Sequence, residues 1–285
     1  MRPRTAADSR NYVVAFEVRS AADCPGDFLL PRAAAGADAG IFLPRDDPDW
    51  FGRSAYPPRI LLLSAGTFWA VPHPSANALP VYCEIGRISS IGSGRMLLKG
   101  WLSFRCAGFD CTIPYNTRGH PSVLGFIRQF RSRWLGALRE DGTPQVTLGD
   151  ELDIRFANAL ADELDPGEAV AARFFQLPRE SKLSWPLRGT RWTRGDLLAK
   201  TDRRLIWITD RDRGSRLQYG TISSCAPLRS SWKLTLISRR NEWHLQVVLP
   251  GEEPWRIPIT AAHSLQAERF AALAEGRLVN SIQRT

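Results

Sequence analysis

The feature that most constrains this chain is a pattern that occurs twice: short strand-like segments followed by one amphipathic helix. In the first half, segments such as Ile60–Ser64 and Trp101–Cys106 have the composition of strands, and turn residues separate them. In the second half, segments such as Val170–Gln176 and Trp243–Val248 follow the same rule. Short strands at regular spacing are typical of antiparallel sandwiches or barrels rather than of parallel βαβ units. We therefore expect a mainly β (α+β) protein.

Helices are predicted where apolar residues recur every three or four positions. The first helix has the apolar stripe Val123, Ile127, Phe130, Trp134 and Leu138. The second and third are expected over 151–164 and after residue 260, with stripes that include Ile154, Leu160 and Leu164, and Leu265, Phe270 and Leu273.

Short matches between the two halves indicate an internal repeat. Phe68–Val71 is similar to Ile206–Thr209, and Trp101–Phe104 is similar to Trp243–Gln246. The spacing between matched segments drifts along the chain, as expected when insertions fall in loops. We therefore predict two copies of one fold.

The repeat gives a domain organisation. The first domain is predicted over 11–139 and contains a long insertion over 20–58, where Pro, Gly and Asp residues break regular structure. A helical linker is predicted over 140–165, and the second domain over 166–280.

The second copy resembles bacterial pleckstrin-homology-like (PH/GRAM-like) domains. The residues that carry the resemblance are Leu164–Glu168, a lead-in to the first strand, and Leu197–Asp210, which contains the turn Thr201-Asp202-Arg203-Arg204. Ile222–Ser224 is similar to the segment that follows in those families. The resemblance covers about 165–276, and membership of the first copy, where Ser64–Thr67 replaces the turn, depends on the repeat.

This resemblance implies two tandem PH-like β-sandwich or barrel domains, each with seven strands and a C-terminal α-helix. It also implies a bacterial, non-enzymatic protein whose function is binding. The turn is plausible on physical grounds as well, because Thr and Asp side chains accept hydrogen bonds from backbone N–H groups nearby.

The charge is unevenly distributed. Residues 1–167 contain 18 basic and 18 acidic residues, whereas residues 168–285 contain 20 basic and 11 acidic residues, so the second part accounts for the formal charge of +9. An asymmetry of this kind predicts that any anionic ligand or acidic partner binds the second domain.

The candidate anion- or partner-binding residues are arginines, whose forked donors match phosphate and carboxylate groups. They are Arg191, Arg194, Arg203, Arg204, Arg211, Arg213 and Arg216. Asp210 and Asp212 lie beside three of them, so the alternative is a solvated hairpin with local ion pairs. A protein partner and an anionic membrane surface are both open interpretations.

Two alternative functions remain at this level. Arginine and tryptophan residues are mixed over 173–216, a composition that also suits nucleic acid, whose binding would weaken steeply with salt. An enzyme with a site between the two domains is the other alternative, but the sequence shows no convergent set of titratable residues.

Several classes are disfavoured. Cys106 and Cys111 have no second close pair and the four histidines are scattered, so we expect no metal site, no cofactor and no catalytic residues. No stretch approaches the roughly 20 apolar residues of a membrane span. The first ten residues lack an apolar signal segment, and five cysteines suit reduced thiols, so we expect a cytoplasmic protein.

Overall fold

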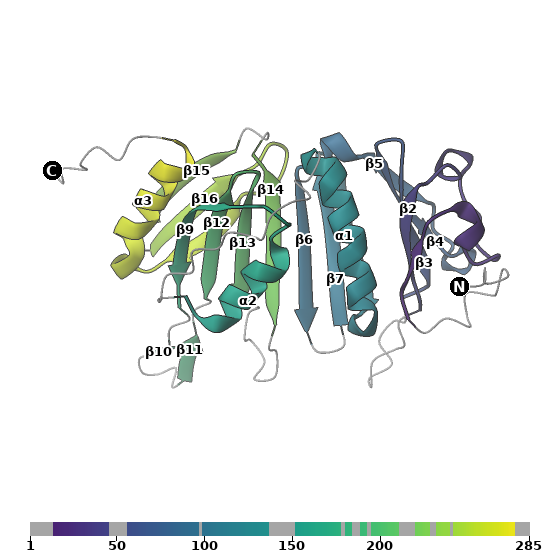
Figure 1. Cartoon of the computed structure of the whole chain (residues 1–285). Coiled ribbons are helices and arrows are strands. Elements are labelled where there is room, and N and C mark those ends of the chain that lie inside the picture. The colour runs from purple at the N-terminus through teal and green to yellow at the C-terminus, as the bar shows by residue number, and fades with distance from the viewer. Residues whose placement is uncertain are drawn as a thin grey trace. The chain divides into compact units, whose positions relative to one another are not determined.

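The computed structural model describes residues 14–45, 56–96, 99–136, 152–177, 180–183, 189–192, 195–210, 220–228, 232–239 and 242–276. Within these residues the protein is mainly β, with a few helices (Figure 1). The chain divides into two compact units, each described below by itself. Unit 1 comprises 1–88, 95–104 and 109–137, and unit 2 comprises 89–94, 105–108 and 138–285.

The main sheet of unit 1 is antiparallel, and its five strands follow one another in chain order. These strands are β1 (Phe16–Val18), β2 (Ala39–Leu43), β3 (Arg59–Ser64), β4 (Thr67–Pro72) and β5 (Val81–Glu84). Later in the chain come β6 (Ser90–Met96), β7 (Lys99–Cys106), β8 (Phe109–Asn116) and the helix α1 (His120–Leu135). Short 3₁₀ helices occupy Ala21–Asp23, Arg32–Ala34, Pro74–Ala76, Ile85–Arg87 and Thr117–Gly119.

The core of unit 1 lies between its strands and α1. Phe68 of β4, Phe104 of β7 and Phe130 of α1 are fully buried, and their ring centroids lie 4.3–6.0 Å apart. The indole N–H of Trp134 donates to the Ile88 carbonyl at 2.7 Å, which fixes the last turn of α1. The predicted apolar stripe of α1 is therefore confirmed over its described residues.

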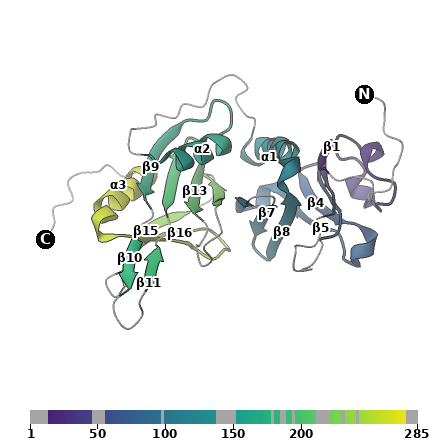
Figure 2. The same ribbon diagram turned by 90° about the horizontal axis from the view of Figure 1, so that it is seen from below.

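Unit 2 has one antiparallel group of strands in the order β14-β13-β12-β9 and a second in the order β15-β16-β17. The strands are β9 (Val170–Gln176), β12 (Asp196–Thr201), β13 (Arg204–Asp210), β14 (Thr221–Pro227), β15 (Lys233–Arg239), β16 (Glu242–Val248) and β17 (Trp255–Ile259). The hairpin β10 (Glu180–Leu183) and β11 (Gly189–Trp192) lies between β9 and β12 in the chain and projects from the rest of unit 2 (Figure 2). A 3₁₀ turn at Ala261–His263 leads into the helix α3 (Ser264–Ala274).

The two faces of the strands β9, β12, β13 and β14 bury different partners. One face holds Phe174, Leu198 and Leu205, which belong to a core shared with β15–β17 and α3. Residues on the other face include Phe175, whose ring lies 5.3 Å from that of Phe156. Phe156 belongs to α2 (Ile154–Glu163), so this helix packs on the second face.

Helix α2 is thus part of unit 2, although the sequence pattern placed it in a linker over 140–165. Phe156 and Leu160 are fully buried, and 138–285 belongs to unit 2. The apolar stripe of α2 is displaced from the predicted stripe. Ile154, which was expected in the stripe, is 74% exposed, and Phe156 takes its place.

The prediction of seven strands in each half is wrong. Eight described strands precede α1 and nine follow α2. Strand β2 lies inside the predicted insertion 20–58, and the hairpin β10–β11 was not expected.

The predicted stripe of α3 is also shifted. Leu265 and Leu273 are 40% and 55% exposed, whereas Phe270 is buried together with three alanines, Ala267, Ala271 and Ala274. Small residues permit close approach of the helix to the strands, so the buried face was hidden from a search for large apolar residues.

Candidate functional site

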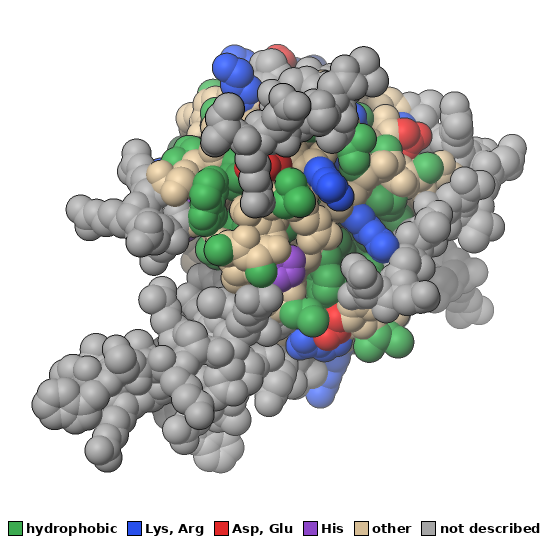
Figure 3. Space-filling view, turned by 90° about the vertical axis from the view of Figure 1, so that its left-hand side faces the viewer, with side chains coloured by type: hydrophobic (Ala, Val, Ile, Leu, Met, Phe, Trp, Pro, Cys, Tyr) green, Lys and Arg blue, Asp and Glu red, His purple; other side chains and the backbone are tan. Residues whose placement is uncertain are grey.

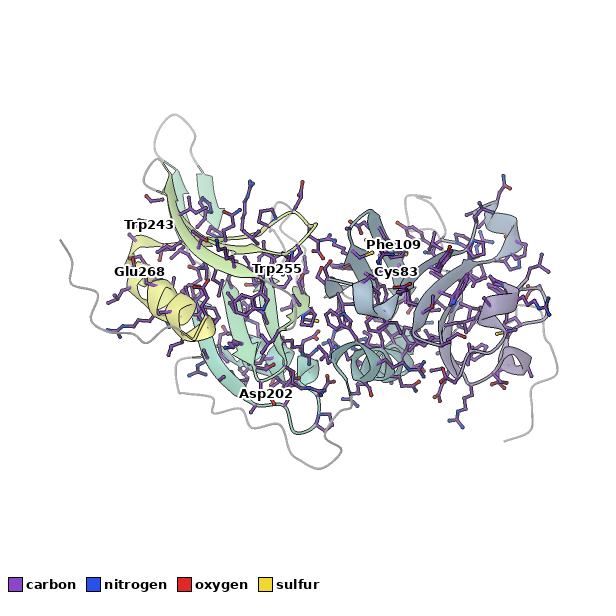
Figure 4. The ribbon with its side chains drawn as sticks, turned by 90° about the horizontal axis from the view of Figure 1, so that it is seen from above. Cys83, Phe109, Asp202, Trp243, Trp255 and Glu268 are labelled. Carbon is purple, nitrogen blue, oxygen red and sulfur yellow. The ribbon has the colours of Figure 1, made fainter. Side chains whose placement is uncertain are left out.

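The β12–β13 hairpin positions two clusters of polar residues, one at its turn and one at the opposite end of the strands. At the turn, the Thr201 hydroxyl oxygen accepts from the backbone N–H groups of Arg203 and Arg204 at 3.1 and 3.0 Å. Asp202 and Ala169 are joined by two hydrogen bonds, one through the Asp202 carboxylate. The predicted side-chain-capped turn is confirmed, and Figure 4 shows Asp202 at the margin of unit 2.

The turn cluster consists of Arg204, Glu168, Asp165 and Thr201, all of them buried. The Arg204 guanidinium donates to both carboxylate oxygens of Glu168, at 2.8 and 2.6 Å. It also donates to Asp165 at 3.2 Å and to the carbonyl of Glu163, the last residue of α2, at 2.6 Å. Arg204 therefore ties the end of α2 and the start of β9 to the hairpin.

The charges of the turn cluster stabilise one another. Burial alone would raise the pKa of Glu168, but the hydrogen bonds and charge of Arg204 outweigh it and hold that pKa below its ordinary value. Burial likewise opposes the charge of Arg204, and Glu168 overcomes this and raises the pKa of the guanidinium. With no exposed surface and several carboxylate partners, Arg204 has nothing to offer a ligand.

The strand-end cluster begins where the segments on either side of the hairpin meet. The backbone N–H of Asp210, the last residue of β13, donates to the Gly195 carbonyl at 3.1 Å. The Thr209 hydroxyl donates to the same carbonyl at 3.3 Å. Gly195 immediately precedes β12, so the chain entering β12 and the chain leaving β13 are joined at this point.

A buried carboxylate, Asp196, fixes the core side of the strand end. It accepts from the Gln176 amide nitrogen at 3.0 Å and from the Trp207 indole N–H at 3.0 Å. The same Gln176 nitrogen donates to the Pro258 carbonyl of β17. These bonds tie the ends of β9, β12 and β17 together, so the base of the strand end is a fixed structure.

On the other face of the same strands lie Asp210 and Arg155. Asp210 is 7% exposed and has the same strand parity as Arg204, so it faces the layer of α2. Arg155, near the start of α2, hydrogen-bonds Asp153, whose carboxylate caps the helix. The hydrogen bond to Asp153 is the main cause that raises the pKa of Arg155, and the field of Asp210 adds to it.

The structure separates the predicted arginines. Arg203 and Arg204 lie at the turn, whereas Arg194 precedes Gly195 and Arg211 follows Asp210 at the strand end. Asp210 lies six positions along β13 from Arg204, or about 20 Å at ~3.3 Å per residue. A single phosphate therefore cannot contact the turn and the strand end at once, so a site centred on Asp210 does not include Arg203 and Arg204.

The remaining candidate arginines belong to the chain segments that enter β12 and leave β13. Arg191 lies in β11, where its register partner is Ser181. Arg194, Arg211, Arg213 and Arg216 lie outside the described residues. The segments 177–195 and 211–220, which contain these arginines, have eight basic residues and two acidic ones.

Residues that sequence reasoning missed are Arg155, Asp196 and Gln176. Arg155 was placed in the linker, and only its position two residues after a helix-capping Asp marks it. Asp196 and Gln176 are ordinary strand residues by sequence, and their pairing follows from the register of β9 with β12, which no local pattern reveals.

Other site types have little support in the described part of the chain. Among these residues no group of three or more His, Cys, Asp or Glu side chains is arranged to hold a metal ion. No described helix has the length and hydropathy needed to cross a membrane. On the face seen in Figure 3, the described basic side chains are separated by hydrophobic and polar ones.

Comparisons with protein-family models, with curated proteins and with solved structures gave no match. The site is therefore interpreted from its own geometry and charge.

Proposed function

We propose that the protein is a non-enzymatic binding protein of two PH-like domains, whose second domain binds a phosphate-bearing anion at the strand end. The ligand contacts are assigned to Arg191, Arg194, Arg211, Arg213 and Arg216. Arg203 and Arg204 are left out, because they belong to the turn.

The order of elements supports the PH-like interpretation. Strands β9 and β12–β17 followed by α3 give seven strands and a helix once the β10–β11 hairpin is set aside. Strands β2–β8 followed by α1 give the same order earlier in the chain once β1 is set aside. The similarity of the two orders agrees with the short sequence matches.

The observation that carries the anion site is the bond between Asp210 and the Gly195 carbonyl. It holds together the roots of two segments that have eight basic residues and two acidic ones. Several guanidinium groups bind a phosphate better than one, and both segments begin at this bond. The fixed base made by Asp196, Gln176 and Trp207 reduces the ordering that binding requires.

The test uses pyrophosphate as the probe and a charge-matched control. The triple variant Arg211→Glu, Arg213→Glu and Arg216→Glu reverses three charges at the strand end. The control, Lys233→Glu, Arg256→Glu and Arg269→Glu, makes the same change at exposed positions elsewhere in unit 2. Calorimetric titration is expected to give binding by the unmodified protein, at least about a tenfold loss in the first variant, and less than about a twofold change in the control, since tenfold corresponds to about 1.4 kcal/mol.

Absence of binding by the unmodified protein, or equal losses in the two variants, would overturn the proposal. Co-sedimentation with phosphatidylcholine vesicles, with and without an anionic phospholipid, then separates a lipid headgroup from a free phosphate compound. A duplex DNA probe is run alongside. Binding to DNA that exceeds binding to pyrophosphate and falls steeply with salt would replace this function with nucleic-acid binding.

A further inference from the structure

A series of hydrogen bonds in unit 1 joins Ser75, His73 and Asp27. The Ser75 hydroxyl lies 2.7 Å from Nδ1 of His73, and Nε2 of the same imidazole lies 3.1 Å from the Asp27 carboxylate. Asp27 and His73 are 46 positions apart in the chain, so no local pattern reveals their pairing. A hydroxyl, an imidazole and a carboxylate in this order are the groups of an activated nucleophile.

The backbone sets the direction of these hydrogen bonds. The Ser75 backbone N–H, which can only donate, lies 3.1 Å from Nδ1 of His73. Nδ1 is therefore the unprotonated nitrogen, and Nε2 carries the ring proton and donates to Asp27. The Ser75 hydroxyl consequently donates to Nδ1, and His73 is placed as its base. The best-known serine triads use the two ring nitrogens the other way round, but either nitrogen of an imidazole can accept a proton.

The fold holds the imidazole in place. His73 follows β4, and its backbone N–H donates to the Pro58 carbonyl at 2.9 Å. Phe28, the neighbour of Asp27, is buried in the core, and its ring lies edge-on to the imidazole at 5.2 Å. The His73 side chain is only 17% exposed, whereas Ser75 is exposed. The base is thus positioned and shielded, and the nucleophile is open to solvent.

We propose that Ser75 is a reactive serine that accepts an acyl group from an activated ester or thioester, with His73 as its general base and Asp27 as the residue that positions His73. The Ser75 oxygen attacks the acyl carbon and forms a C–O bond, while the hydroxyl proton passes to Nδ1 of His73. The bond from the acyl carbon to the leaving oxygen or sulfur breaks, and the leaving group takes that proton and departs as an alcohol or thiol. A single transfer without turnover modifies the protein, so the inference goes beyond the proposed binding function and does not conflict with it.

The turn that contains Ser75 indicates that the acyl donor must be activated. The backbone N–H groups of Ala76 and Asn77 donate to the carbonyls of His73 and Pro74, at 2.9 and 3.2 Å. These two N–H groups are therefore not free to stabilise the oxyanion of an addition intermediate, a contribution on which acyl-transfer enzymes depend. A donor with a good leaving group needs less of this stabilisation. Thioesters and aryl esters fit the site for this reason, and peptide bonds do not.

The experiment measures acetylation of the full chain by p-nitrophenyl acetate, followed residue by residue with peptide mass spectrometry. Ser20 is the internal control, because it is exposed and its hydroxyl donates at 3.2 Å to a carboxylate, Asp23, rather than to an imidazole. Acetylation of Ser75 is expected to be at least about a hundredfold faster than that of Ser20, since a positioned general base contributes about 10²–10⁴-fold.

Variants separate the chemistry from the structure. His73→Asn keeps an acceptor for the Ser75 backbone N–H but removes the base, so acetylation of Ser75 is expected to fall at least about a hundredfold while that of Ser20 stays unchanged. Asp27→Asn is expected to lower acetylation of Ser75 at least about tenfold, and Asp27→Glu, which keeps the carboxylate, to restore part of the rate. The ratio to Ser20 in the same sample corrects for a general effect on folding.

Equal acetylation of Ser75 and Ser20 in the unmodified protein would overturn this inference. Normal acetylation of Ser75 in His73→Asn would do the same, because the serine would then react without its base. Normal acetylation in Asp27→Asn would exclude the positioning role of Asp27. None of these results concerns pyrophosphate binding by unit 2, so failure here is distinct from failure of the proposed function.

Discussion

The two ends of the β12–β13 hairpin contain the same residue types, arginine and aspartate, in opposite arrangements. At the turn, Arg204 is fully buried and its donors are taken up by Glu168, Asp165 and the end of α2. At the strand end the carboxylates are buried, whereas the arginines belong to the connecting segments. An arginine between buried carboxylates serves the fold, so Arg204 is left out of the proposed ligand contacts.

The largest expected effect comes from Arg204→Met at the turn. Removal of the guanidinium leaves the buried carboxylates of Glu168 and Asp165 without their partner, which costs about 3–5 kcal/mol. Urea unfolding followed by tryptophan fluorescence measures the change. Arg203→Met, at the next position of the same turn and only half-buried, is the control and is expected to cost less than about 1 kcal/mol. Similar losses in both variants would remove the distinction between the two arginines.

A second expected effect concerns the attachment of α2 to unit 2. Leu160→Ala deletes a fully buried side chain and is expected to cost about 3 kcal/mol. Ile154→Ala, on the same helix but 74% exposed, is expected to stay within about 0.5 kcal/mol. If both substitutions were neutral, α2 would be a linker, as the sequence pattern suggested.

The next expectation concerns pH. Because the pKa of Glu168 is lowered in the folded protein, its pairing with Arg204 stabilises the fold fully above the unfolded pKa near 4.5. That stability is lost as the pH falls through the lower folded pKa. Glu168→Gln cannot titrate, so its stability is expected to fall less between pH 5 and pH 3 than that of the unmodified protein. Parallel curves over this window would contradict the assignment.

The smallest effect is expected at the start of α2. The Asp153 carboxylate accepts from the Arg155 backbone N–H at 2.8 Å and caps the helix. Asp153→Ala is expected to cost about 1 kcal/mol, whereas Asp153→Asn, which keeps the acceptor, is expected to cost less. Thermal unfolding of both variants measures the difference, and equal destabilisation would show that the hydrogen bond is not the source.

Local patterns predicted the hairpin well. The strands β9, β12 and β13 follow from alternating apolar residues, and the turn Thr201-Asp202 follows from side chains that cap a turn. Both signals act over a few residues. The stripe of α1 was predicted for the same reason, because Val123, Ile127 and Phe130 are large and regularly spaced.

The functions of the arginines could not be predicted in this way. Arg203 and Arg204 are adjacent and identical in type, and only the partners Glu168 and Asp165, more than 30 residues away, decide which one is buried. The strand-end cluster depends on the register of three strands. Strand β2 was missed because it lies among residues that break regular structure, and its pairing with β1 and β3 compensates for weak local preference.

The most direct measurement of the central claim is an NMR titration of the ¹⁵N-labelled protein with pyrophosphate. The account predicts that amide shifts concentrate at Gly195, Asp210 and Arg155, while the amides of Ala169, Arg203 and Arg204 stay unchanged. Shifts that concentrate at the turn, or that are absent at the strand end, would contradict it.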